Sequence, residues 1–406
     1  MYLVQDKGGA IALMLAALVF LGTWPAIMNF LEQRGRKLQH TYLDYSITNL
    51  LVAIVFALTF GQFGHSDDGQ PNFLTQLGQD NGPSVAFALA GGLVLSVGNL
   101  ACQYAWPFVG LSATEVISAS ITVVIGSTMN YFLDGRINRA EVLFPGVACF
   151  LIAVCLGSAL HKSNDKDIKR KLQLALKEQG STEELKTRPA VGAAEPSELE
   201  SGVNVPTTET KTVIGSAEFL KQLEDKRAVK VGSANYLFGL SIVLVAGLCF
   251  SLFSPAFNLA TNDQWNSLKP NVPHLVVYTA FFYFSIAAFV FGFGINLLFL
   301  YRPAMGLPKS SFPAYVADWN GRPWALLAGV LCGCGNGFQF MGGQAAGYAA
   351  ADAVQALPLV STFWGILIFG EYHRSSRKTY VLLVSMLVMF IAAVAILMSS
   401  SGHRKS

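Results

Sequence analysis

Two carboxylic acids occupy equivalent positions in long apolar stretches of this sequence. Glu115 and Asp352 stand 237 residues apart, and each follows a glycine, Gly110 or Gly347, by five residues. A carboxylate inside a bilayer costs about 2.5 kcal/mol or more, so each acid needs a cavity, a partner or a proton. Because a buried carboxyl group can bind and release a proton, the pair predicts a proton-coupling group in each half of the chain. The simpler alternative is a carboxylate stabilised by the start of its helix.

Amide side chains lie near both acids in the sequence. Asn99 and Gln103 are four residues apart, and Asn336 and Gln339 are three apart, so each pair shares a helix face. An amide both donates and accepts hydrogen bonds, which suits a small ring carrying N–H next to C=O. Hydrogen bonding between helices is the alternative role.

Aromatic residues near these amides offer flat surfaces for such a ring. The predicted substrate-binding residues are Trp24, Asn99, Gln103, Tyr104, Asn336 and Gln339. The central apolar stretches contain no Lys or Arg, so a phosphate or sugar-nucleotide ligand would find no counter-charge there. The expected ligand is therefore a neutral heterocycle, and we predict no catalytic residue, metal site or cofactor.

These side chains must be positioned by helices in a membrane. The chain is 52% hydrophobic and only 13% charged, whereas soluble domains carry about 25% charged residues. That composition excludes a soluble enzyme, a secreted disulfide-rich module and a nucleic-acid binder. Ten stretches are long enough to cross a bilayer: residues 8–30, 42–61, 84–108, 113–133, 141–160, 236–259, 274–301, 323–346, 349–369 and 378–399.

An internal repeat organises these ten stretches. A shift of 237 residues aligns the two acids and also the following pairs: Gly92 with Gly329, Asn99 with Asn336, and Asp134 with Glu371. Each half then contains five spans, and because five is odd the halves must face opposite ways. The predicted fold is an all-α polytopic membrane protein with ten transmembrane helices arranged as two inverted five-helix repeats.

Four regions follow from this division. Residues 1–160 form the first five-helix transmembrane repeat, 161–235 a polar and largely disordered loop, 236–400 the second repeat, and 401–406 a short tail. Two features recur in both repeats. Pro25 and Pro255 are expected to interrupt the first helix of each repeat near the binding region. Asp134 and Glu371 are expected to end the fourth helices as exposed, structural charges.

The loop of residues 161–235 holds 13 Lys or Arg and 12 Asp or Glu, which is typical of a solvated linker. A phosphate-binding loop requires a second glycine before Lys-Ser/Thr, but residues 180–187, GSTEELKT, have leucine there. Nucleotide binding is therefore not expected. The six cysteines lie in apolar stretches and show neither zinc nor disulfide spacing.

Basic residues in the short loops predict the orientation of the chain. Nine Lys or Arg fall on the side that carries the 161–235 loop, and six fall on the other side. Since basic loops favour the cytosol, the loop is expected to be cytosolic and both termini extracellular.

Long stretches of the sequence resemble the plant ureide permeases. The resemblance rests on KGGAIALMLAALVFLGTWPAIM, GNLACQYAW and especially TEVISASITVVIGSTMNYFLDGRINRAEVLFPGVACFLIAVC. It covers nearly the whole chain except the middle of the loop, and the second half also resembles the wider drug/metabolite transporter superfamily. It implies a ten-helix, proton-driven importer at the plasma membrane for allantoin and related oxo-derivatives of nitrogen heterocycles, including uracil.

Two alternatives stay open at this point. One is a drug/metabolite-type exporter of another small neutral solute. The other is a membrane scaffold that acts through its cytosolic loop. The expected partners of the leading interpretation are a small heterocyclic substrate, protons and the lipid bilayer.

Overall fold

A computed structural model describes residues 2–4, 6–64, 70–186, 236–263, 272–304 and 306–402, with the backbone alone at 172 and 175–186. The elements formed by these residues are all helices, and ten of them are long and apolar enough to cross a membrane, as predicted. The spans are α1 (Lys7–Gln33), α2 (Leu38–Leu58), α4 (Gly82–Val109), α5–η1–α6 (Leu111–Leu133), α7 (Ala140–Lys186), α9 (Tyr236–Asn262), α10 (Val277–Tyr301), α12 (Arg322–Ala346), α13–η3–α14 (Tyr348–Phe369) and α15 (Arg377–Ser399). Two short helices, α3 (Phe73–Leu77) and α11 (Phe312–Ala317), lie in connections.

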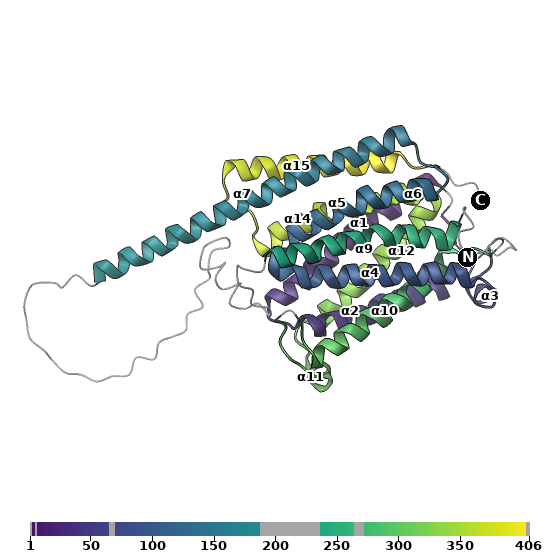
Figure 1. Cartoon of the computed structure of the whole chain (residues 1–406), viewed down its shortest axis with the longest axis horizontal. Coiled ribbons are helices and arrows are strands. Elements are labelled where there is room, and N and C mark those ends of the chain that lie inside the picture. Colours follow the sequence, from purple (N-terminus) through teal and green to yellow (C-terminus); the bar gives the residue numbers. More distant parts are fainter. Residues whose placement is uncertain are drawn as a thin grey trace, which may run out of the picture.

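The bundle has two distinct ends (Figure 1). One carries both chain termini together with α3 and α6, and we call it the termini end. At the other, the loop end, α11 lies beside the bundle and α7 extends out of it. This helix continues to Lys186, past the predicted limit of its span at 160. The rest of the expected loop, residues 187–235, lies outside the described residues.

Contacts between the two halves of the chain occur in exchanged pairs. The first helix of each half packs against the third helix of the other half, α1 on α12 and α9 on α4. Likewise α2 packs on α12 as α10 packs on α4, and α1 packs on α14 as α9 packs on α5. This pattern is what two halves of one design would produce; their inverted relation stays a prediction.

Equivalent glycines allow two of these close approaches. A Cβ atom built on Gly92 of α4 would lie 1.8 Å from the carbonyl oxygen of Phe284 in α10. On Gly329 of α12, it would lie 2.2 Å from the carbonyl oxygen of Tyr45 in α2. Neither position can accept a side chain unless the helices move apart, so glycine here sets the distance between spans.

The predicted interruptions at the prolines are wrong. Pro25 lies inside the continuous helix α1, and Pro255 lies inside the continuous α9. Spanning helices tolerate proline because neighbouring groups and small local adjustments satisfy the freed backbone. The irregular turns fall instead in the fourth span of each half: a π-helical turn at Thr122–Gly126 and a 3₁₀ turn at Asp352–Gln355.

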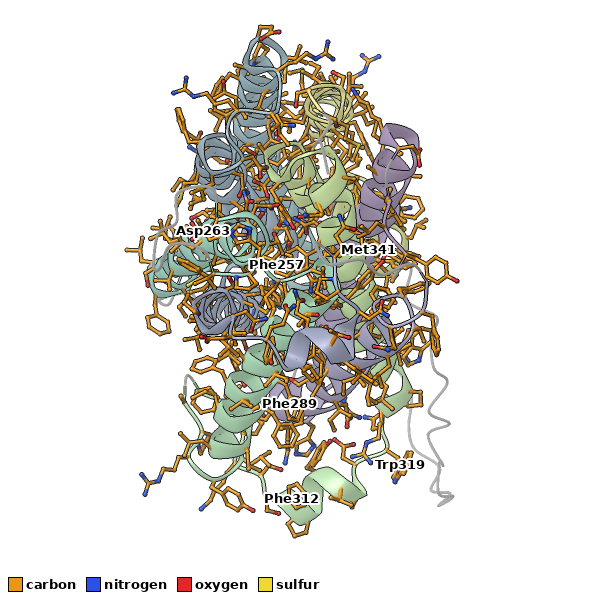
Figure 2. All side chains as sticks on the ribbon, turned by 90° about the vertical axis from the view of Figure 1, so that its right-hand side faces the viewer. Phe257, Asp263, Phe289, Phe312, Trp319 and Met341 are labelled. Atoms are coloured by element: carbon orange, nitrogen blue, oxygen red, sulfur yellow. The ribbon has the colours of Figure 1, made fainter. Side chains whose placement is uncertain are left out.

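The side chains divide into an aromatic centre and an apolar outer surface. Figure 2 looks along the bundle and shows Phe257 among the central helices, with Phe312 and Trp319 at the periphery. Phe257 is fully buried and stacks on Phe340, with ring centroids 3.6 Å apart. Outward-facing residues such as Val290, at 65% exposure, form a surface suited to lipid.

Candidate functional site

A small cavity lies between the two halves, and both halves contribute polar side chains to it. Its volume is about 30 Å³, enough for a water molecule but not for a heterocycle. Its lining includes Trp24, Asn99, Glu115, Cys332, Asn336 and Gln355, together with Cys102 and the rings of Phe250 and Phe253. Among the described residues, no Lys or Arg lines it. In this conformation the cavity is closed to anything as large as a ring.

A chain of hydrogen bonds links the two equivalent asparagines beside this cavity. Asn99 Nδ2 donates to the hydroxyl of Tyr45 at 3.1 Å, and that hydroxyl lies 3.0 Å from Cys332 Sγ. Asn336 Nδ2 donates to the same sulfur at 3.4 Å. Tyr45 also stacks on Trp24, with ring centroids 5.1 Å apart and planes inclined by 27°. The amides, the hydroxyl and the thiol therefore form one connected polar group.

Tyr45 and Cys332 were not predicted as site residues. Cys332 lies four residues before Asn336, so helical spacing alone could have placed it on the same face. A cysteine in an apolar span is ordinarily a packing residue, which hid this role. Tyr45 had no comparable signal, because its place in the site depends on how α2 packs against α12.

Glu115 is buried, at 3% exposure, and lines the cavity. The indole N–H of Trp106 faces its carboxyl group without completing a hydrogen bond, and this N–H has no other partner within the described residues. Trp106 lies beside Trp24, with ring centroids 6.1 Å apart. Glu115 is therefore surrounded by aromatic side chains, and the indole N–H of Trp106 is the donor that faces its carboxyl group.

Asp352 is fully buried but is absent from the cavity lining. Its Oδ2 accepts a hydrogen bond from Asn130 Nδ2 at 2.9 Å, and the same nitrogen lies 2.8 Å from Ser254 Oγ. Asn258 supports this arrangement by donating to Asn130 Oδ1 at 3.2 Å. The structure therefore holds Asp352 in an amide-rich network between the fourth span of the first half and α9.

The remaining predicted binding residues are distributed unevenly. Gln339 accepts a hydrogen bond from Gln355 at 3.3 Å and so meets the cavity through that neighbour. Gln103 donates to the carbonyl oxygen of Leu38 at 3.3 Å, and Tyr104 donates to Asn296 at 2.7 Å. These last two side chains tie α4 to α2 and α10 and do not line the cavity. The structure brings together Trp24, Asn99 and Asn336.

Asp134 and Glu371 close the two ends of the bundle in the same manner. Asp134 Oδ2 accepts the backbone N–H of Tyr348 at 2.7 Å, and Glu371 Oε2 accepts the hydroxyl of Ser112 at 2.7 Å. The expectation of an exposed charge is wrong for Asp134, which has 0% exposure, because the start of α13 in the other half covers it. At Glu371, burial raises the pKa of the carboxyl group above its ordinary value, although the Ser112 hydrogen bond opposes the shift.

Buried ion pairs reinforce the loop end. Arg36 lies 2.6 Å from Asp44, and Arg322 lies 3.3 Å from the same carboxylate. His40 lies 2.6 Å from Asp318. Burial alone would raise the pKa of the Asp318 carboxyl group, but the hydrogen bond from His40 and the charge of Arg36 hold it below its ordinary value. The connection α1–α2 is thereby joined to the α10–α12 connection.

Uncharged groups dominate the corresponding closure at the termini end. Asn138 Nδ2 donates to the carbonyl oxygen of Ala346 at 3.0 Å, and the backbone N–H of Gly402 donates to the same oxygen at 3.1 Å. The backbone N–H of Arg139 donates to the carbonyl oxygen of Ser400 at 3.0 Å.

Within the described part of the chain, no cluster of three His, Cys, Asp or Glu could hold a metal ion.

Comparison of the sequence with known proteins shows the family of this chain. A family model described as ureide permease matches residues 41–400. Ureide permease 2 and ureide permease 1 of Arabidopsis thaliana are each 66% identical to this chain, over 405 and 406 residues. Each alignment covers 100% of this chain and 100% of the relative. Probable ureide permease A3 of Vigna unguiculata is 57% identical over 386 residues, 94% of this chain and 100% of that protein. With ten spans and full-length identity, the chain belongs to the ureide permease family, and it is a multi-pass membrane transporter of ureides rather than an enzyme.

Proposed function

We propose that this chain imports allantoin and related oxo-derivatives of nitrogen heterocycles, uracil included, across the plasma membrane by proton-coupled secondary transport. The observation that carries the proposal is the central cavity. It joins an asparagine from each half to a carboxyl group with no completed hydrogen bond, and no basic side chain among the described residues lines it.

Neutral cyclic ureides and pyrimidines present the hydrogen-bonding edge that these side chains complement. Each carries N–H beside C=O, and Asn99 and Asn336 supply both a donor and an acceptor. Trp24, already stacked on Tyr45, provides a flat aromatic surface for the ring. The absence of a lining cation from the described residues disfavours phosphates and carboxylates as cargo.

Transport through this cavity requires the halves to move. A volume of about 30 Å³ cannot hold the substrate, so the helices around it must separate toward one side at a time. The glycine contacts of α4 with α10 and of α12 with α2 define the stiff units that would move together. Under the predicted orientation, the termini end faces outward and the loop end faces the cytosol.

The coupled proton is assigned to Glu115 in this proposal. Its carboxyl group borders the substrate cavity, whereas Asp352 stands behind the Asn130 network. Substrate entering the cavity would change the surroundings of Glu115 directly. The Trp106 indole N–H, unpartnered among the described residues, is placed to donate to the ionised form after the proton leaves.

Uptake assays test the function. Labelled allantoin and labelled uracil would be offered to cells that lack their own carriers. The external pH would be about 5.5 or about 7.5, on either side of the range in which groups titrate near neutrality. We expect faster uptake at the acidic pH, with accumulation abolished by a proton ionophore. Uptake independent of pH and of the ionophore would refute proton coupling, and efflux without uptake would identify an exporter.

A competition panel then orders the substrates. Allantoin, uracil, xanthine and hydantoin would be tested as unlabelled competitors against the better of the two labelled compounds. Competition by these neutral rings, with none by uridine monophosphate, is the expected pattern because the lining carries no basic group among the described residues. Competition by the nucleotide would contradict the proposed neutral site.

A further inference from the structure

We propose that Asp134 and Glu371 are positioning residues that act as reciprocal latches, each fastening the segment that carries the other half's buried acid and releasing it when its own end of the bundle opens. The inference deepens the proposed function, since it assigns a means of opening to the same pathway.

At the termini end, the latch joins the end of α6 to the start of α13. The Asp134 carboxylate accepts the backbone N–H of Tyr348 at 2.7 Å in a fully buried position. Gly347, immediately before, has a φ of 97°, a conformation that favours glycine and aims this N–H at the acid. Asp352 follows Tyr348 by four residues, so the latch fixes the one turn of chain that presents Asp352 to Asn130.

At the loop end, the same relation appears with the halves exchanged. Glu371 of the second half accepts the Ser112 hydroxyl at 2.7 Å, and Ser112 precedes Glu115 by three residues, one helical turn. Gly110 before this turn has a φ of 89°, the counterpart of Gly347. A Cβ atom on Gly365 would lie 2.6 Å from Glu371 Oε2, so a close packing contact also holds the carboxylate in place.

Each latch bridges the two halves, and this location makes it more than a helix cap. When the halves rock apart at one end, the groups that face each other across that end must separate. Opening the loop end parts Glu371 from Ser112 and uncovers the turn with Glu115. Opening the termini end parts Asp134 from Tyr348 and uncovers the turn with Asp352.

Water can stabilise the released carboxylate at the loop end. Ser112 also borders a separate cavity of about 370 Å³, together with Thr362, Tyr372 and His161. The polar groups on its otherwise mainly apolar wall offer partners to water, so a Glu371 parted from Ser112 would have water within reach. The latch can therefore open and close reversibly.

The native thiol Cys332 reports which end is open, because it lines the central cavity. The assay uses the full chain with the other five cysteines replaced by alanine, in sealed right-side-out and inside-out vesicles. A membrane-impermeant methanethiosulfonate reagent is added from one side at a time. Two control variants identify the side that the reagent reaches. In a chain lacking all native cysteines, Arg136→Cys places a thiol at an exposed position of the termini end, and His373→Cys does so at the loop end.

Opposite sidedness is the expected result. Glu371→Ala should raise Cys332 labelling from the loop end roughly tenfold and not from the termini end, because one partly buried hydrogen bond between the halves is lost. Asp134→Ala should raise labelling from the termini end alone. Glu371→Gln and Asp134→Asn keep an acceptor oxygen and should restore the parent pattern.

Several outcomes would overturn the latches. Equal increases from both sides would show general loosening, and unchanged labelling in both alanine variants would show that these contacts do not limit opening. Ser112→Ala and Asp134→Ser break the same bonds with smaller changes, so they decide the question where an alanine variant does not fold. The assay needs neither ureide nor a proton gradient, so a failure of proton-coupled uptake and a failure of the latches remain separate results.

Discussion

Glu115 and Asp352 occupy the same position of the repeat, yet their surroundings differ almost completely. Asp352 accepts a hydrogen bond from Asn130 and lies away from the central cavity. Glu115 lines the cavity beside Trp24 and faces an indole N–H that it does not engage. Equivalent positions in the two halves therefore carry the same kind of residue in different surroundings.

The difference arises from neighbours as well as from the local helix. Trp24 precedes Pro25 as Ser254 precedes Pro255, so one half has an aromatic ring where the other has a hydroxyl. Beyond the irregular turns, Asn130 is fully buried, whereas its counterpart Leu367 is 58% exposed. A π turn in one fourth span and a 3₁₀ turn in the other rotate the following residues differently.

The comparison shows that a buried acid in a membrane protein can be fixed by hydrogen bonds, as Asp352 is, or can face a cavity, as Glu115 does. We call the first a held acid and the second an available acid. The network around Asp352 engages its Oδ2 and connects two helices, while its Oδ1 has no hydrogen-bond partner within the described residues. The cavity around Glu115 leaves its bonding free to change when water or substrate enters. We therefore expect mutations at the two positions to separate coupling from stability.

The largest expected effect is on proton coupling. Glu115→Gln keeps the size of the side chain but cannot bind and release a proton, so accumulation of substrate against its gradient should be abolished. Exchange of labelled for unlabelled substrate, which needs no net proton movement, should persist. Both quantities are measured by uptake and counterflow in the same proteoliposomes.

Asp352→Asn is the matched control for that variant. Its amide oxygen can still accept from Asn130, so pH-driven accumulation should remain. If Asp352→Asn abolishes accumulation while Glu115→Gln preserves it, the roles are reversed. If both variants preserve it, neither acid carries the coupled proton.

The next effect concerns substrate affinity. Asn99→Leu removes a cavity amide and should raise KM about 5- to 150-fold, which corresponds to about 1–3 kcal/mol for a ring group left without its partner. Gln103→Leu, one turn further along α4 but outside the cavity, should leave KM within about twofold. An equal loss of affinity in both variants would place the substrate nearer the loop end than we propose.

The third effect is on stability and should fall on the other acid. Asp352→Ala leaves buried Asn130 and Ser254 groups with lost partners, which should cost about 1–3 kcal/mol and lower the unfolding temperature in detergent. Glu115→Ala removes only the approach of the Trp106 indole N–H to the carboxyl group and should shift this temperature less. A larger loss of stability for Glu115→Ala would contradict the distinction between a held and an available acid.

The smallest effect tests the residue that precedes the proline in the first helix of each half. Ser254→Ala removes one hydroxyl from the Asp352 network, and it should cost about 1 kcal/mol with transport kinetics unchanged. Trp24→Ala, at the equivalent position, should instead raise KM because it removes the aromatic face of the cavity. Equal thermal shifts with unaltered KM in both variants would show that Trp24 serves packing alone.

Much of the fold was predictable because membrane spans obey simple rules. Ten apolar stretches of sufficient length predicted ten spanning helices, and all ten are present in the described residues. The repeat of Gly92 and Gly329 marked two close approaches between helices. The prolines misled the prediction, because Pro25 and Pro255 lie in continuous helices while the irregular turns begin at Thr122 and Asp352.

Apolar length acts locally along the chain, so the class of protein and its ten candidate spans were predictable from the sequence. The correspondence of Glu115 with Asp352 rests on their spacing of 237 residues and stays a prediction. Tertiary structure decided which side chains meet. Tyr45 enters the site from α2 because Gly329 lets that helix approach, and Gln103 turns to Leu38 instead of the cavity. Asp134 becomes a buried partner of Tyr348 because the opposite half covers it. These hydrogen bonds join residues 54, 65 and 214 positions apart, and no local pattern specifies them.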